Sequence, residues 1–203
     1  MRVLMIDAGP NPESTTYIAL NEIRGQLQKE GVECEIVHTG GQNVEGCRFC
    51  NSCKKTGRCV LDDCLNPLLE RAAEADAYIF ASQSHYGVAN GNLALLIHRF
   101  ITADLTCVGK PVATVVTCRR SGATSALAEL NSFFAMKSMP VVNSSYWNLL
   151  VGSTPEQVSQ DEEGLRTMRN LARNMAWLLK KLHASEPVHP EPSEARIATN
   201  FIR

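Results

Sequence analysis

The chain has 203 residues and a formal net charge of −1, with 44% hydrophobic and 20% charged residues. This length is enough for one domain with a full hydrophobic core. The near-neutral charge and the lack of a long Lys/Arg block argue against nucleic acid as a partner. There is no run of about 18 apolar residues and no signal-peptide pattern, so we expect a cytoplasmic protein without a membrane partner.

Strand patterns and helix patterns alternate along the chain. Apolar, β-branched runs predict strands at residues 3–7, 34–38, 77–81 and 111–117, and a short fifth strand that opens at Val141 and Val142. Apolar residues at helical spacing predict helices at residues 14–30, 65–74, 93–103, 123–138 and 165–182. The alternation predicts an α/β fold: a flavodoxin-like three-layer sandwich with a five-stranded parallel sheet in the order 2-1-3-4-5. We expect residues 1–183 to form this domain and residues 184–203, with three prolines, to form an extended arm.

The loop after the first strand is rich in groups that bind anions. Ser14, Thr15 and Thr16 stand where the first helix begins, and Gly9 and Asn11 precede them. Hydroxyls and backbone N–H groups at a helix N-terminus, with the positive end of the helix dipole behind them, favour a phosphate. Neither a P-loop nor a G-x-G-x-x-G spacing is present, so a mononucleotide fits best, with FMN as the leading candidate. The alternative is that Ser14 and Thr16 only cap the helix.

Two more polar loops, residues 82–92 and 118–122, follow the third and fourth strands. In parallel sheets of this order the ligand lies beyond the carboxyl ends of the strands, so these loops would hold a flavin ring between them. Solvated loop residues and unpartnered surface arginines are the alternative. The candidate contacts are Gln83, Ser84, His85, Tyr86, Gly87 and Asn90 in one loop, and Thr117, Arg119, Arg120 and Gly122 at the other.

A long loop over residues 39–64 holds five of the eight cysteines. Within its cysteine-rich part, residues 44–64, Cys47, Cys50 and Cys53 form a C-x2-C-x2-C pattern, and Cys59 follows after five intervening residues. Three readings stay open: a [4Fe–4S] cluster, a tetrahedral zinc site, and metal-free thiols. Basic residues in the same segment would balance the charge of a cluster; they are Arg48, Lys54, Lys55 and Arg58.

These motifs resemble those of the NAD(P)H-dependent FMN reductases of the flavodoxin-like superfamily, and among them the iron–sulfur flavoproteins. Residues 9–16 are similar to the family's phosphate loop, residues 81–99 to its ring-binding segment and residues 115–124 to the loop over the flavin. The four cysteines resemble the compact motif of iron–sulfur flavoproteins. The chain departs from the family at Asn11, where arginine is common, at Gln83, where proline is common, and at His85.

The resemblance implies an FMN-dependent oxidoreductase that passes electrons from NAD(P)H to a flavin, a quinone or another small acceptor, with a [4Fe–4S] cluster as an optional relay. An electron carrier fed by a ferredoxin-like protein, without nicotinamide activity, is the alternative. A receiver-like signalling module is disfavoured because Asp7 stands alone where Mg²⁺ binding needs clustered carboxylates. We also expect a homodimer or homotetramer, since a second subunit would shield a flavin at an open sheet edge.

Overall fold

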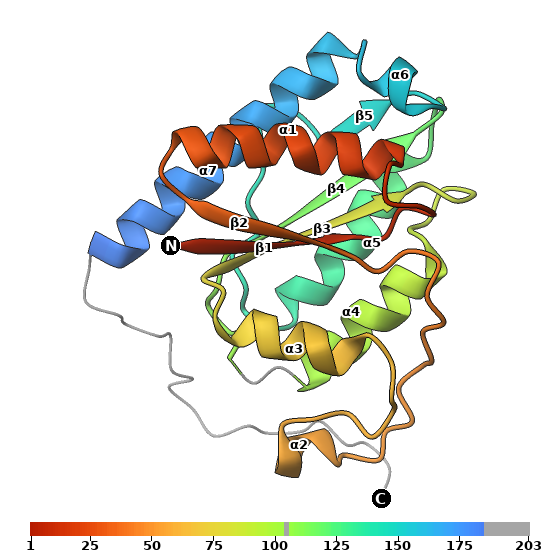
Figure 1. The fold of residues 1–203 in the computed structure, drawn as a ribbon, viewed down its shortest axis with the longest axis vertical. Helices are drawn as coiled ribbons and strands as arrows, with labels where there is room; N and C mark the ends of the chain where they lie inside the picture. The colour runs from red at the N-terminus through yellow and green to blue at the C-terminus, as the bar shows by residue number, and fades with distance from the viewer. Residues whose placement is uncertain (104–105, 185–203) are drawn as a thin grey trace, which may run out of the picture.

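The computed structural model describes residues 1–103 and 106–184. Five parallel strands form one sheet in the order β2-β1-β3-β4-β5 (Figure 1), as predicted. Continuous apolar runs become the central strands because both faces of the sheet are covered. The strands are β1 (Arg2–Asp7), β2 (Glu33–His38), β3 (Ala77–Gln83), β4 (Val112–Cys118) and β5 (Leu149–Val151).

Helices cover both faces of the sheet (Figure 1). The helices α1 (Thr15–Lys29) and α7 (Glu162–Ala184) pack on one face, and α3 (Leu65–Ala73), α4 (Gly91–Ala103) and α5 (Ala123–Ala135) pack on the other. Two single-turn helices, α2 (Cys53–Thr56) and α6 (Pro155–Val158), lie in connecting segments. No helix among the described residues is long and apolar enough to cross a membrane.

The side chains of β1 alternate between the two cores, as a strand buried on both faces requires. Leu4 and Ile6 join the core under α3, α4 and α5, whereas Val3 and Met5 join the core under α1 and α7. All four are fully buried. Burying such a side chain contributes about 1.5–3 kcal/mol relative to exposure, so β1 anchors the loop that follows it.

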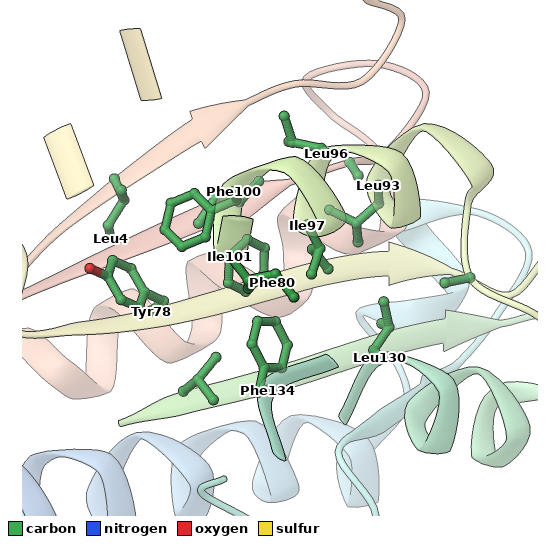
Figure 2. Packing of buried hydrophobic residues seen from close by; sticks show 14 of the residues in the cluster. Leu4, Tyr78, Phe80, Leu93, Leu96, Ile97, Phe100, Ile101, Leu130 and Phe134 are labelled. Atoms are coloured by element: carbon green, nitrogen blue, oxygen red, sulfur yellow. The ribbon is translucent and has the colours of Figure 1, made fainter. Parts of the chain in front are cut away.

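Aromatic rings fill the core under α4 and α5 (Figure 2). The ring of Phe80 packs edge-to-face on Phe100, with centroids 5.5 Å apart, and stacks on Phe134 at 5.1 Å. Tyr78 packs edge-to-face on Phe100 at 5.2 Å. These rings hold α4 and α5 against β3. The polar loops at the ends of β3 and β4 are therefore attached to well-packed elements.

The predicted fifth strand is wrong in position. Val141 forms only an isolated bridge with Val112, at the start of β4, and Val142 N–H donates to the Val112 carbonyl. The strand that completes the sheet pairs instead with the end of β4, where Val116 lies opposite Leu149. The intervening chain leaves the sheet, and the buried Asn148 side chain ties it back by donating to the Val142 carbonyl.

Other boundaries shift by a few residues. Ser82 and Gln83 extend β3 and Cys118 extends β4, although the sequence pattern placed Ser82, Gln83 and Cys118 in loops. The long loop contains α2, and α5 ends at Ala135, before the predicted residue 138. The predicted arm lies outside the described residues except for Ala184, which ends α7.

Candidate functional site

Three loops meet at the carboxyl edge of the sheet, as the strand order predicts. The hydroxyls of Thr15, at the start of α1, and Thr117, near the end of β4, are hydrogen-bonded at 2.8 Å. The Gln83 side chain, at the end of β3, donates to the Thr15 hydroxyl at 3.0 Å. Ser84 N–H donates to the Thr117 carbonyl at 2.8 Å. The first helix and the two flanking loops are thus joined by polar contacts around Thr15.

A buried carboxylate lies beneath the first loop, and the sequence pattern did not assign it a role there. Asp7 Oδ1 accepts a hydrogen bond from Gly9 N–H at 2.9 Å and from the Thr16 hydroxyl at 2.6 Å. The Ser14 hydroxyl is bonded to Thr16 at 2.7 Å, and His38 Nδ1 lies 3.1 Å from Asp7 Oδ2. Of the three predicted phosphate hydroxyls, that of Thr16 therefore donates to the carboxylate, and that of Ser14 is hydrogen-bonded to Thr16. The signal in the sequence was an acidic residue directly after a buried apolar run.

The N-terminus of α1 keeps its backbone donors available. Ser14 occupies the cap position in an extended conformation, but its side chain makes no capping hydrogen bond, and the first turn contains no acidic residue. The first N–H groups of a helix have no partners within the helix. The Ser14 side chain therefore does not cap the helix, and the N–H groups of this turn are available to bind an anion.

A tight turn forms the tip of the second loop. His85 and Val88 exchange two backbone hydrogen bonds, at 2.8 and 3.1 Å, and Tyr86 and Gly87 between them both have positive φ, 54° and 87°. Two left-handed residues are typical of a type I′ turn, which explains glycine at the second position. The Tyr86 side chain is fully exposed at this tip.

The second and third loops touch at two glycines. Gly122 has a φ of 86°, and a Cβ placed there would lie 2.9 Å from Gly87 Cα and 2.8 Å from Ser84 Oγ. The Ser125 hydroxyl adds a link by donating to the Gly87 carbonyl at 2.6 Å. Only glycine at position 122 permits this backbone approach.

Two open cavities lie along this edge and share Ser84 and Arg119 as lining residues. Their volumes are about 520 and 260 Å³, the larger within the range of small-molecule sites. The larger is lined by Ser84, Tyr86, Gly87, Arg119, Arg120, Ser121 and Gly122, and the smaller by Thr15, Gln83, Ser84, Thr117, Cys118, Arg119, Gly152 and Ser153. Sequence reasoning missed Gly152 and Ser153, because it placed the fifth strand too early.

The predicted contacts divide into two groups. Nine of them line these cavities: Thr15, Gln83, Ser84, Tyr86, Gly87, Thr117, Arg119, Arg120 and Gly122. His85 and Asn90 line neither, and the Asn90 side chain accepts from Asn92 N–H at the start of α4. Among the described residues neither Arg119 nor Arg120 forms a salt bridge, so both charges are available to an anionic ligand.

The four predicted cysteine ligands line one small pocket. Cys47, Cys50, Cys53 and Cys59 surround a cavity of about 40 Å³, and none of them is in a disulfide. The backbone turns sharply beside Cys50, where Phe49 and Asn51 both have positive φ. In the part of the chain that the structure describes, no three His, Cys, Asp or Glu side chains are placed to hold a single metal ion. The four thiols thus line one pocket, and the choice among a cluster, a zinc site and metal-free thiols stays open.

Two of the basic residues of this segment form ion pairs on the surface. Arg48 pairs with Glu45 and Arg58 with Glu70, and the side chains of both arginines are about 60% exposed. A third arginine, outside the segment, lies against the pocket: Arg99 of α4 donates to Cys59 Sγ at 3.1 Å. Its signal in the sequence was a charged residue on the apolar face of a helix.

Arg99 is held by Asp63, which its guanidinium contacts through both terminal nitrogens. Burial works against both charges, but the hydrogen bonds between the two groups outweigh it, so the pKa of Asp63 is lowered and the pKa of Arg99 is raised. Both groups therefore stay ionised at neutral pH.

The sheet order and the three loops at its carboxyl edge define a flavodoxin-like protein. Residues 1–152 match the family described as NADPH-dependent FMN reductase. The chain belongs to this family, a family of FMN-dependent oxidoreductases, and the resemblance seen in the sequence is confirmed.

Similar curated proteins are named as iron–sulfur flavoproteins. One from Methanocaldococcus jannaschii is 30% identical over 190 residues, which cover 89% of this chain and 98% of that protein. One from Archaeoglobus fulgidus is 29% identical over 188 residues, covering 89% of this chain and 92% of that protein.

Solved structures share the fold. RosB, crystallised with 8-demethyl-8-formylriboflavin-5′-phosphate, has a TM-score of 0.73 at 14% identity and covers 99% of this chain and 92% of its own. FerB, an NAD(P)H:acceptor oxidoreductase of Paracoccus denitrificans, has a TM-score of 0.64 at 14% identity and covers 89% of this chain and 97% of its own.

Proposed function

We propose that this chain binds FMN at the carboxyl edge of the sheet, takes electrons from NAD(P)H and passes them to a flavin, a quinone or another small acceptor. The observation that carries the proposal is the junction of three loops at Thr15, beside two cavities that share Ser84 and Arg119. Membership of the FMN reductase family supports it.

The N-terminus of α1 is the proposed phosphate site. Its first-turn N–H groups have no side-chain cap, and no acidic residue stands in that turn. Asn11 supplies no positive charge, and Asp7 lies buried under the loop, so backbone donors and the helix dipole would carry the attraction.

The wall of the larger cavity is the proposed ring site. Backbone at Gly87 and Gly122 allows close approach of a flat ligand, and Arg119 and Arg120 supply positive charge for a reduced ring or for a nicotinamide cofactor phosphate. Bound FMN would supply the redox chemistry by accepting a hydride from NAD(P)H and releasing two electrons to the acceptor. The two substrates would use the same open face in turn, which predicts ping-pong kinetics.

Cys47, Cys50, Cys53 and Cys59 are the proposed ligands of a [4Fe–4S] cluster. Their common pocket and the absence of disulfides support this, as do the names of the similar proteins. The pocket lies at the C-terminal end of α4, where Thr102 lines it, whereas the loop of the proposed ring site precedes that helix. A cluster held by the four cysteines would supply one-electron transfer.

One anaerobic purification tests the proposal. We expect a flavin spectrum with one FMN per chain, and about four irons and four sulfides per chain. Anaerobic mixing with NADPH or NADH should bleach the flavin within the time of one turnover. A protein that binds no FMN at micromolar concentration would contradict the proposal.

An electron carrier fed by a ferredoxin-like protein is the second candidate, and the cysteine pocket favours it. It predicts a flavin that neither NADH nor NADPH bleaches but that a reduced ferredoxin does. Anaerobic mixing with NADH, with NADPH and with reduced ferredoxin therefore separates the two functions.

A further inference from the structure

A buried arginine stands directly behind the cysteine pocket. Arg99 is 2% exposed, whereas its neighbours Leu96 and Phe100 on α4 are apolar core residues. Taking a guanidinium out of water costs several kcal/mol unless it is fully paired. The chain provides the pairing: Asp63 contacts both terminal nitrogens, and the Glu45 carbonyl accepts from Nη1 at 3.2 Å.

The pairing also includes a thiol. Arg99 Nη2 donates to Cys59 Sγ at 3.1 Å, a short distance for a hydrogen bond to sulfur. Cys59 is one of the four thiols that line the pocket. The Arg99 Nε–H is the one buried side-chain nitrogen or oxygen in residues 1–103 and 106–184 that has no hydrogen-bond partner. The guanidinium thus has more donors than the protein around it uses.

Arg99 differs from the other arginines near the loop in its burial, and so in how strongly solvent screens its charge. Arg48 and Arg58 are exposed, so water and salt screen them. The charge of Arg99 is screened far less. Asp63 neutralises this charge, and Arg99 Nη2 donates both to Asp63 and to Cys59 Sγ. Hydrogen bonds to ligand sulfur and nearby charge are two of the factors that set the reduction potential of an iron–sulfur cluster.

We propose that Arg99 is a positioning residue for a cluster in this pocket, whose hydrogen bond to Cys59 Sγ helps to retain the cluster and raises its reduction potential. The inference rests on the proposed function, because it needs the four thiols to hold a cluster. If the ion pair with Asp63 served only the fold, a variant that keeps the positive charge but loses the contact with Cys59 would leave the potential unchanged.

The test compares Arg99→Gln with Arg58→Gln in protein reconstituted with iron and sulfide without oxygen. Each change removes one positive charge near Cys59. The charge of Arg99 is buried, and that of Arg58 is exposed. Redox titration, followed by the electron paramagnetic resonance of the reduced cluster, measures the potential. We expect Arg99→Gln to disfavour cluster reduction about tenfold, a shift of about 59 mV, and Arg58→Gln to change it little. Loss of iron from Arg99→Gln, with wild-type circular dichroism and FMN binding, would also support the proposal.

Two further variants cover the case in which Arg99→Gln does not fold. Arg99→Lys keeps a charge but cannot contact Asp63 and Cys59 together, so the potential should also fall. Asp63→Asn keeps the arginine and removes its neutralising charge, so the potential should rise. Unchanged potential and iron content in the folded variants would overturn the inference while leaving the proposed function intact. A wild-type protein that takes up no iron and sulfide would overturn both.

Discussion

The Thr16 hydroxyl donates to the buried Asp7 carboxylate at 2.6 Å, directly beneath the proposed phosphate site. Gly9 N–H donates to the same oxygen at 2.9 Å. Asp7 therefore orders the loop, but it also places negative charge below an anion and occupies donors that the anion could use. The geometry of the loop therefore suits a phosphate, whereas the negative charge of Asp7 opposes phosphate binding.

Asp7→Asn should tighten FMN binding. The asparagine carbonyl can accept the same two hydrogen bonds, so the loop keeps its shape while the charge is removed. The gain should be about 1–2 kcal/mol, the size expected for a charge interaction across several ångströms of protein. Flavin-fluorescence titration measures it. Glu13→Gln is the matched control, because this exposed residue of the same loop is screened by water and should have little effect. Equal affinities in wild type and Asp7→Asn would count against this placement of the phosphate.

Gly122→Ala should weaken FMN binding and destabilise the fold. A methyl group there would meet Gly87 Cα and Ser84 Oγ, and the backbone has a φ of 86°. The cost should be about 1–3 kcal/mol in the free energy of unfolding, as for other forced left-handed residues. Urea unfolding and flavin titration measure the two effects.

Gly31→Ala controls for backbone strain alone. Gly31 has a φ of 75°, but a Cβ there would meet nothing within 4 Å. It should cost about 1 kcal/mol in stability and leave FMN affinity unchanged. If Gly122→Ala retains native FMN affinity, the contact between the second and third loops is not a wall of the flavin site.

The strand order could be predicted because the central strands are continuous apolar runs. The fifth strand could not be placed, because two short apolar segments compete for the edge of β4. Val141 pairs with its start and Leu149 with its end, and the sequence does not show which one extends the sheet. The polar residues between them include Asn148, whose side chain bonds to Ser144 N–H and to the Val142 carbonyl and so holds the bend between the two segments.

The site was predictable at the level of loops and less so at the level of side chains. The convergence of Thr15, Gln83 and Thr117 follows from strand order alone. The inward turn of the Thr16 hydroxyl depends on Asp7, and the contact of Arg99 with Cys59 depends on how α4 packs under the long loop. Both contacts join residues of different elements, so the pattern within one element does not reveal them.

We predict a homodimer or homotetramer at micromolar concentration. Both tryptophans are more than half exposed, Trp147 at 56% and Trp177 at 62%, and the Tyr146 ring packs on Trp147 with centroids 4.9 Å apart. Exposed aromatic residues are enriched at protein interfaces. Light scattering should give a mass of two or four chains, and tryptophan emission should shift to the red on dilution. A single-chain mass at that concentration would rule the assembly out.

The reactivity of the thiols should report what the cysteines bind. Cys50 is exposed, whereas Cys118 is buried, and burial raises the pKa of the Cys118 thiol, so little reactive thiolate forms there. In metal-free protein, iodoacetamide should label Cys50 first and reach Cys118 only after unfolding. Peptide mass spectrometry measures the rate at each position.

Anaerobic reconstitution with iron and sulfide should then protect Cys50, because a thiolate bound to iron is no longer free to attack the reagent. Cys34 is the internal control: it lies on β2, outside the pocket, and burial also raises its pKa, so its slow labelling should not change. If about four irons per chain are incorporated and Cys50 still reacts at its metal-free rate, then Cys50 is not a ligand, and the fourth thiolate of a Cys₄ cluster must come from another cysteine such as Cys64.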